Sequence, residues 1–131
     1  MTVNPGLVLG PTLVGNNFSS GDIIKKFLLR EMPGLPKVAF PVVDVREVAE
    51  AHLKALTNEN AANKRFMLVN RCMWFHEIGL ALHEKYGQDY KIPKKVLPKF
   101  MCKLGAIFDK DVRLIMPKWG VEETYVNTQT S

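Results

Sequence analysis

Two histidines and a glutamate are the first residues whose types suggest chemistry, because they are common zinc ligands. A metalloprotease helix places its histidines four residues apart with the glutamate between them, so that both face one metal. Here His76 and His83 are seven residues apart, and Glu77 directly follows the first. Cys72 is close enough to share a helix face with them, but three ligands on one short segment leave no obvious supporting residues. We expect no metal site.

A tyrosine and a lysine form a second candidate, because Tyr90 and Lys94 have the Tyr-x-x-x-Lys spacing. On a helix this spacing sets a catalytic phenol beside the lysine that lowers its pKa. Pro93 lies between them, and proline removes an amide from the helix and pushes Ile92 out of the helical region. We interpret the match as a coincidence in an extended segment.

The glycine-rich segment 10–17, GPTLVGNN, has the glycine spacing of a phosphate-binding loop. It lacks the lysine and the serine or threonine that contact the phosphates and the metal. The chain also contains no G-x-G-x-x-G turn of the dinucleotide-binding kind. No complete phosphate-binding motif is therefore present.

Length and composition indicate one ordinary folded domain of 131 residues with 47% hydrophobic content. No apolar run approaches the roughly 20 residues of a membrane helix, and the N-terminus lacks signal-peptide features. We expect a cytoplasmic protein without a membrane partner. Cys72 and Cys102 lack paired spacing, so we expect free thiols.

The net charge of +5 includes a local cluster of lysines. Lys95, Lys99 and Lys103 are four residues apart and would form one stripe on a helix, whose other face holds Val96, Leu97, Phe100 and Leu104. A nucleic-acid site would need aromatic or loop partners for the bases. We expect a solvated basic face and no nucleic-acid partner.

Hydrophobic periodicity predicts alternating strands and helices. The predicted strands are Thr2 to Leu9, Val42 to Val45 and Arg65 to Asn70. The predicted helices are Asp22 to Leu29, Arg46 to Leu56, Met73 to Tyr86, Lys94 to Phe108 and Asp109 to Met116. This order is typical of an α/β fold.

Several segments, in order, carry a resemblance to a known family. They are VNPGLVLGPTL (residues 3–13), SSGDII (19–24), PGLPKVAFPVVDVREVAEAHLKAL (33–56), KRFMLVN (64–70), YKIPKKVLPKF (90–100) and AIFDKDVRLIMPKWG (106–120). The chain resembles the extended short-chain dehydrogenase/reductases, within the epimerase/dehydratase superfamily. The dihydroflavonol reductase-like and aldehyde reductase branch fits best.

The resemblance places this chain late in such a protein. It implies that residues 1–131 are a single partial domain, the C-terminal, substrate-side portion of a Rossmann-type reductase. The nucleotide-binding half, with its Gly-rich turn and its catalytic Tyr and Lys, would precede this chain, and a last helix and strand would follow it. We therefore expect a truncated reductase and assign no catalytic residue to this chain.

The resemblance also implies binding roles for residues that are present. Pro5, Gly6 and Leu7 match the turn whose backbone lies against the nicotinamide ring, and Ser20 matches a serine that contacts the cofactor, with Ser19 as a one-residue alternative. Thr12, Leu13 and Phe18 match a loop of the substrate pocket. From the residues alone, the first group reads as a simple turn and the serines as a helix N-terminus.

Asp44 and Arg46 resemble a site, but we interpret them mainly as a helix start. A carboxylate at Asp44 can accept the free backbone amides there. The chain has Glu47 where the family commonly has aspartate, and Gln129 where lysine is frequent near the end. The second departure leaves that end of the site undefined.

The implied function is part of an NADP-dependent oxidoreductase that reduces an aldehyde or ketone to an alcohol, with NAD as the alternative cofactor. The alternative function is a catalytically inactive truncated isoform that binds a partner. It rests on the predicted strand Thr2 to Leu9, whose uncovered edge would favour self-association or docking.

Overall fold

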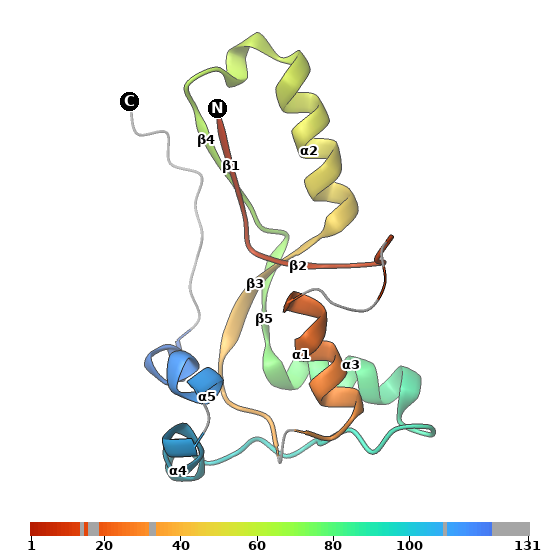
Figure 1. The fold of residues 1–131 in the computed structure, drawn as a ribbon, viewed down its shortest axis with the longest axis vertical. Coiled ribbons are helices and arrows are strands. Elements are labelled where there is room, and N and C mark those ends of the chain that lie inside the picture. Colours follow the sequence, from red (N-terminus) through yellow and green to blue (C-terminus); the bar gives the residue numbers. More distant parts are fainter. Residues whose placement is uncertain (14, 16–18, 32–33, 109, 122–131) are drawn as a thin grey trace.

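The computed structural model describes residues 1–13, 15, 19–31, 34–108 and 110–121, and Figure 1 shows their arrangement. The strands are β1 (Thr2–Pro5), β2 (Leu7–Leu9), β3 (Ala39–Asp44), β4 (Arg65–Leu68) and β5 (Arg71–Trp74). The helices are α1 (Ser19–Leu28), α2 (Val45–Thr57), α3 (Phe75–Tyr86), α4 (Lys99–Phe108) and α5 (Lys110–Ile115), with short 3₁₀ turns η1 (Glu59–Ala61) and η2 (Met116–Lys118). The fold is a mixed α/β one, as predicted, and it includes parallel strand pairs.

The strands of the described part form two sheets. One has β1 parallel to β4, and the other has the order β2-β3-β5, with β2 parallel and β5 antiparallel to β3. In Figure 1 the first sheet runs beside α2, while β3 and β5 of the second sheet descend toward the level of α1 and α3 and β2 runs across the view. The division of the strands into two separate sheets is the main feature that hydrophobic periodicity did not predict.

The prediction of one strand from Thr2 to Leu9 is wrong, because the chain changes partners at Gly6. Pro5 pairs with Leu68 in the first sheet, whereas Leu7 pairs with Val42 in the second. The Gly6 amide donates to the Leu68 carbonyl at 3.0 Å, which ends the first ladder. Within the described residues β1 pairs with β4 alone, so docking on its other edge stays a prediction.

The predicted helix from Met73 starts later, because a strand precedes it. Residues Arg71–Trp74 pair antiparallel with Ala39 to Val42, which also makes β3 longer than predicted. Helix α3 then begins at Phe75, where the Glu77 carboxylate accepts the Trp74 amide at 2.7 Å. This bond satisfies an amide at the helix start that has no partner within the helix.

The main core lies where α1, α3 and the segment before β3 meet. Phe27, Leu35 and Val38 are fully buried, and Phe75 and Ile78 of α3 join them. The Phe27 and Phe75 rings lie 5.4 Å apart between centroids, within the favourable range for aromatic pairs. This cluster holds α1 beside the second sheet.

Helix α2 contributes little to any core, although its bounds closely match the prediction. None of its residues is buried, and Leu53 and Leu56 are 67% and 80% exposed. A cavity of about 250 Å³ separates part of the helix from the first sheet, with Ala51, Ala55 and Phe66 on its walls. The inner face of α2 thus carries small side chains.

Helix α4 begins at Lys99 and not at Lys94 as predicted. The Leu35 amide donates to the Lys95 carbonyl at 2.9 Å, and the Leu97 amide to the Leu35 carbonyl at 2.8 Å. These bonds keep residues 95–97 extended, so Lys95 lies outside the helix and the predicted stripe reduces to Lys99 and Lys103. No helix in the described part of the chain is long and apolar enough to cross a membrane.

Candidate functional site

The predicted cofactor turn lies where the chain passes from one sheet to the other. Pro5 is the last residue of β1 and Leu7 is the first of β2, with Gly6 between them (Figure 1). The turn follows the carboxyl ends of the parallel strands β1 and β4. In α/β folds, ligands bind beyond the carboxyl ends of strands where the strand order changes. Pro5, Gly6 and Leu7 therefore lie at the end of the first sheet at which α/β folds of this kind bind ligands.

Gly6 has a packing reason to be glycine that the sequence did not show. A β-carbon at this position would collide with the carbonyl oxygen of Pro41 in β3. Glycine at position 6 therefore allows close contact between two segments of the protein itself. Any role of Gly6 toward a cofactor is additional to this structural requirement.

The same turn offers a ligand a surface to pack against rather than amide donors. Pro5 has no amide hydrogen, and the Gly6 amide is occupied by the Leu68 carbonyl. Pro5 is exposed, while Gly6 and Leu7 are half-buried. A ligand at Pro5 and Gly6 would therefore be held by contact with the chain rather than by hydrogen bonds from their amides.

Ser20 lies on an element that reaches the turn. It is half-buried in the first turn of α1, and α1 contacts β2, the strand that begins at Leu7. The structure thus brings the helix of Ser20 against β2, the strand that follows the turn.

The predicted substrate loop is less well assembled. Thr12 and Leu13 follow β2 in a loop without regular structure, and both are exposed. The Leu13 side chain is fully exposed, and Phe18 lies outside the described residues. In the described part, the structure does not gather these residues around the turn.

An open cavity of about 450 Å³ lies at the carboxyl ends of β2 and β3, next to that loop. Gly10, Asp44, Glu47 and Arg71 are among its wall residues. Gly10 has φ of 143°, a backbone conformation that favours glycine, and a β-carbon there would lie 2.7 Å from Val45 Cγ1. Sequence reasoning missed this cavity, although a predicted strand that ends just before Gly10 was a usable signal.

The interpretation of Asp44 as a helix cap is confirmed. Its Oδ1 accepts the Arg46 amide at 2.8 Å, and its carboxylate accepts two bonds from the Arg46 guanidinium, at 2.9 and 2.6 Å. The pKa of Asp44 is lowered to about 2. The largest cause is the side-chain hydrogen bonding from Arg46, and the next is the hydrogen bond from the Arg46 backbone amide. The Asp44 carboxylate is thus occupied by hydrogen bonds from Arg46, and its main role is to cap the start of α2.

The residues that suggested other chemistry are not arranged for it. Tyr90 and Lys94 both lie outside helices, which confirms that their spacing does not place them one above the other. Among the described residues, no three potential ligands of the His, Cys, Asp or Glu types gather to hold a metal. His76 instead stacks on Trp74, with 6.3 Å between ring centroids.

Comparisons with known proteins point to reductases. No family model matches the chain. It is 33% identical over 96 residues to cinnamoyl-CoA reductase CAD2 of Medicago truncatula, covering 72% of this chain and 28% of that protein. It is also 33% identical over 93 residues to YDR541C of Saccharomyces cerevisiae (strain ATCC 204508 / S288c), a putative uncharacterized oxidoreductase, covering 66% of this chain and 27% of that protein.

A solved structure, reported in work on structure-guided engineering of a reductase to attenuate substrate inhibition in asymmetric catalysis, has a similar fold. It has a TM-score of 0.58 and 23% identity, and the match covers 96% of this chain and 40% of the solved one. At this identity the likeness supports the fold alone.

These findings confirm the resemblance to reductases of the short-chain dehydrogenase/reductase type. The chain spans between a quarter and a third of the length of the curated relatives, 28% and 27%. The comparisons do not favour the alternative of an inactive partner-binding module.

Proposed function

We propose that this chain is the substrate-side portion of a nicotinamide-dependent carbonyl reductase. In this proposal residues 1–131 form one partial domain, C-terminal to a nucleotide-binding half. The reaction is hydride transfer from NADPH to an aldehyde or ketone, which yields an alcohol, in the cytoplasm. The nicotinamide supplies the hydride when the cofactor is bound.

The observation that carries the proposal is the position of the Pro5 to Leu7 turn. Both curated relatives bear names of oxidoreductases, and the turn that resembles the family's nicotinamide contact lies beyond the carboxyl ends of β1 and β4. Its accessible side presents Pro5 and part of Leu7. The resemblance assigns the nicotinamide contact to this turn, and the position of the turn beyond the carboxyl ends of β1 and β4 supports that proposal.

Each residue then has a defined task. Pro5 and Leu7 would contact the nicotinamide when the cofactor is bound, and Gly6 holds the turn in place by its close approach to Pro41. Ser20 offers a hydroxyl from the first turn of α1. Thr12, Leu13 and Phe18 contribute to the carbonyl pocket, and the proton donor comes from outside these residues.

Calorimetric titration of the 131-residue chain with NADPH and with NADH tests whether the chain contacts the nicotinamide end of the cofactor and not its adenosine end. Residues that read the 2′ position of the adenosine ribose are not assigned to this chain. We therefore expect both nucleotides to bind weakly and with equal affinity. A strong preference for NADPH would contradict the proposed location of the adenosine site.

Two serine variants make the experiment specific to the proposed contact. Ser20→Ala should weaken binding of both nucleotides severalfold, whereas Ser19→Ala should leave it unchanged. The opposite result would assign the contact to Ser19. Equal affinity in both variants and the parent would remove the serine from the site.

A further inference from the structure

The net positive charge of the chain is concentrated in one segment. Residues 94–118 contain seven lysine or arginine residues and two aspartates, a net charge of +5. The whole chain has 18 basic and 13 acidic residues, also +5, so the other residues balance to zero. This segment includes α4, α5 and η2.

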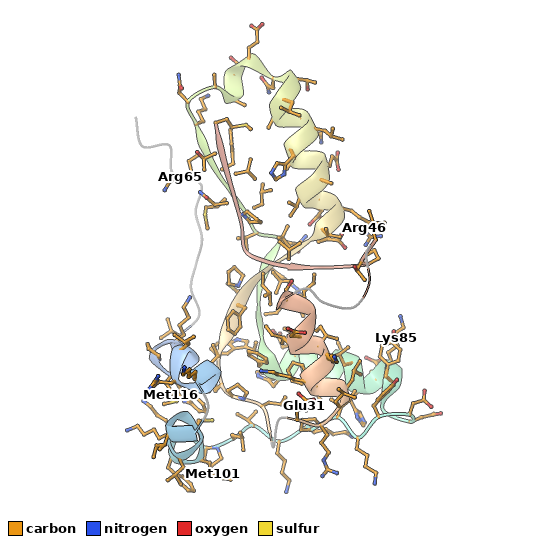
Figure 2. The ribbon with its side chains drawn as sticks, viewed as in Figure 1. Glu31, Arg46, Arg65, Lys85, Met101 and Met116 are labelled. Carbon is orange, nitrogen blue, oxygen red and sulfur yellow. The ribbon has the colours of Figure 1, made fainter. Side chains whose placement is uncertain are left out.

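The same segment exposes an apolar face, which we call the α4–α5 face. Its exposed side chains are Phe100, Met101, Leu104 and Ile107 on α4 and Leu114 on α5, with exposed fractions of 64%, 46%, 56%, 72% and 75%. Figure 2 shows Met101 at the outer edge of α4. Large exposed apolar patches usually mark an interaction surface.

Helix α4 has its apolar stripe on the outside. Cys102, only 3% exposed, points inward, while Phe100, Leu104 and Ile107, at spacings of four and three, share the opposite side. Lys99 and Lys103 border this stripe and are exposed. The helix thus presents apolar side chains flanked by positive charge.

A second copy of the chain is a poor partner for this face. Two such faces would bring like charges together, and the rest of the chain has no net negative charge to offer. A peptide segment would be expected to bind a groove, but neither of the two cavities described above is lined by residues of α4 or α5. An exposed helix with apolar side chains beside lysines matches an anionic surface better.

We propose that the α4–α5 face binds an anionic lipid surface. An amphipathic helix with lysines beside Phe and Leu can lie at a membrane surface, its apolar side chains among the lipids and its lysines at the headgroups. The sequence expectation of no membrane partner rests on the absence of a spanning run. That argument does not concern a helix that lies on the surface.

Vesicle flotation with the full 131-residue chain tests the proposal. The probes are vesicles of pure phosphatidylcholine and of phosphatidylcholine with about one quarter phosphatidylserine. We expect binding to the anionic vesicles alone, strong at about 0.05 M salt and largely lost at about 0.5 M. No binding to anionic vesicles, or equal binding to neutral ones, would overturn the proposal.

Paired variants separate the two components of the face. Lys99→Gln with Lys103→Gln, and Phe100→Ser with Leu104→Ser, should each reduce vesicle binding about tenfold or more. The control is Leu53→Ser with Leu56→Ser, because these α2 residues are at least as exposed but lie outside the basic segment. All three double variants change exposed side chains, and circular dichroism should show an unchanged fold.

Two further outcomes would overturn the proposal. If the Phe100 and Leu104 variant keeps full, salt-sensitive binding, charge alone is responsible and the apolar stripe has no part. If sedimentation shows a dimer of the parent chain that this variant dissociates, a second copy covers the face.

Discussion

Gly6 lies against the carbonyl group of Pro41, at the point where the chain leaves β1 of the first sheet and enters β2 of the second. This contact fixes the path of the turn at residues 5–7, which is the proposed nicotinamide contact. The turn is therefore held by the second sheet and not by local turn chemistry alone.

Gly6→Ala should destabilise the fold, because its methyl group would collide with Pro41. Overpacking of this kind costs roughly 1–3 kcal/mol, measured as the free energy of unfolding in urea. Gly15→Ala is the matched control, since a β-carbon at Gly15 has no neighbour within 4 Å. Equal stability of the two variants would show that Gly6 does not pack against Pro41 as described.

Phe27→Ala should be among the most damaging substitutions, because Phe27 is fully buried against Phe75. Removing a buried phenylalanine side chain costs about 3–5 kcal/mol. Leu29→Ala, one residue beyond the end of α1 and 53% exposed, should change stability by about 0.5 kcal/mol or less. Similar losses of stability in the two variants would mean that Phe27 does not hold α1 against the core.

Helix capping by Asp44 predicts a pH-dependent stability difference. Because the pKa of Asp44 is lowered from 3.8 to about 2, its charged form favours the folded state above 3.8, and this contribution is lost as the pH falls through about 2. Asp44→Asn keeps a capping oxygen but loses the ion pair with Arg46.

The urea midpoint of Asp44→Asn should therefore lie below that of the parent chain at pH 7. The difference should hold down to about pH 5, narrow below that, and close near pH 2. It should be small and decrease with salt, because the pair is exposed. A difference independent of pH between 7 and 2 would contradict this role of the carboxylate.

Local signals explain which elements the sequence predicted well. Helix α2 was predicted within one residue at each end, since its start depends on Asp44, a neighbour in the chain. The start of α4 was predicted too early, because residues 95–97 are held extended by Leu35, some sixty residues away. Strand β5 was missed because it pairs with β3, whose partner residues lie 29 to 35 positions earlier in the sequence.

The candidate site shows the same division. Resemblance suggested Pro5, Gly6, Leu7 and Ser20, whose roles stay a proposal, and the capping role of Asp44 followed from its place before a helix. The clash that Gly6 avoids with Pro41, and the cavity beside Gly10, both depend on how β2 lies along β3. No periodicity within either segment contains that information.

Cys102 should report whether α4 is docked. It is buried, and burial raises the pKa of its thiol, so both access and thiolate fraction are reduced. We expect iodoacetamide at pH 8 to alkylate Cys102 at least about tenfold more slowly in the folded chain than in urea. Mass spectrometry of the labelled peptides measures both rates, and equal rates would mean that α4 is not docked as described.

The most direct test of the account uses the two halves of the cofactor separately. Reduced nicotinamide mononucleotide and adenosine 2′,5′-bisphosphate are titrated into the isotope-labelled chain, and amide resonances are followed by NMR. The account predicts that the nicotinamide compound shifts the amides of Gly6, Leu7 and Ser20, while the adenosine compound shifts none of them. Shifts at these amides from the adenosine compound, or none from the nicotinamide compound, would contradict the proposed division of the reductase.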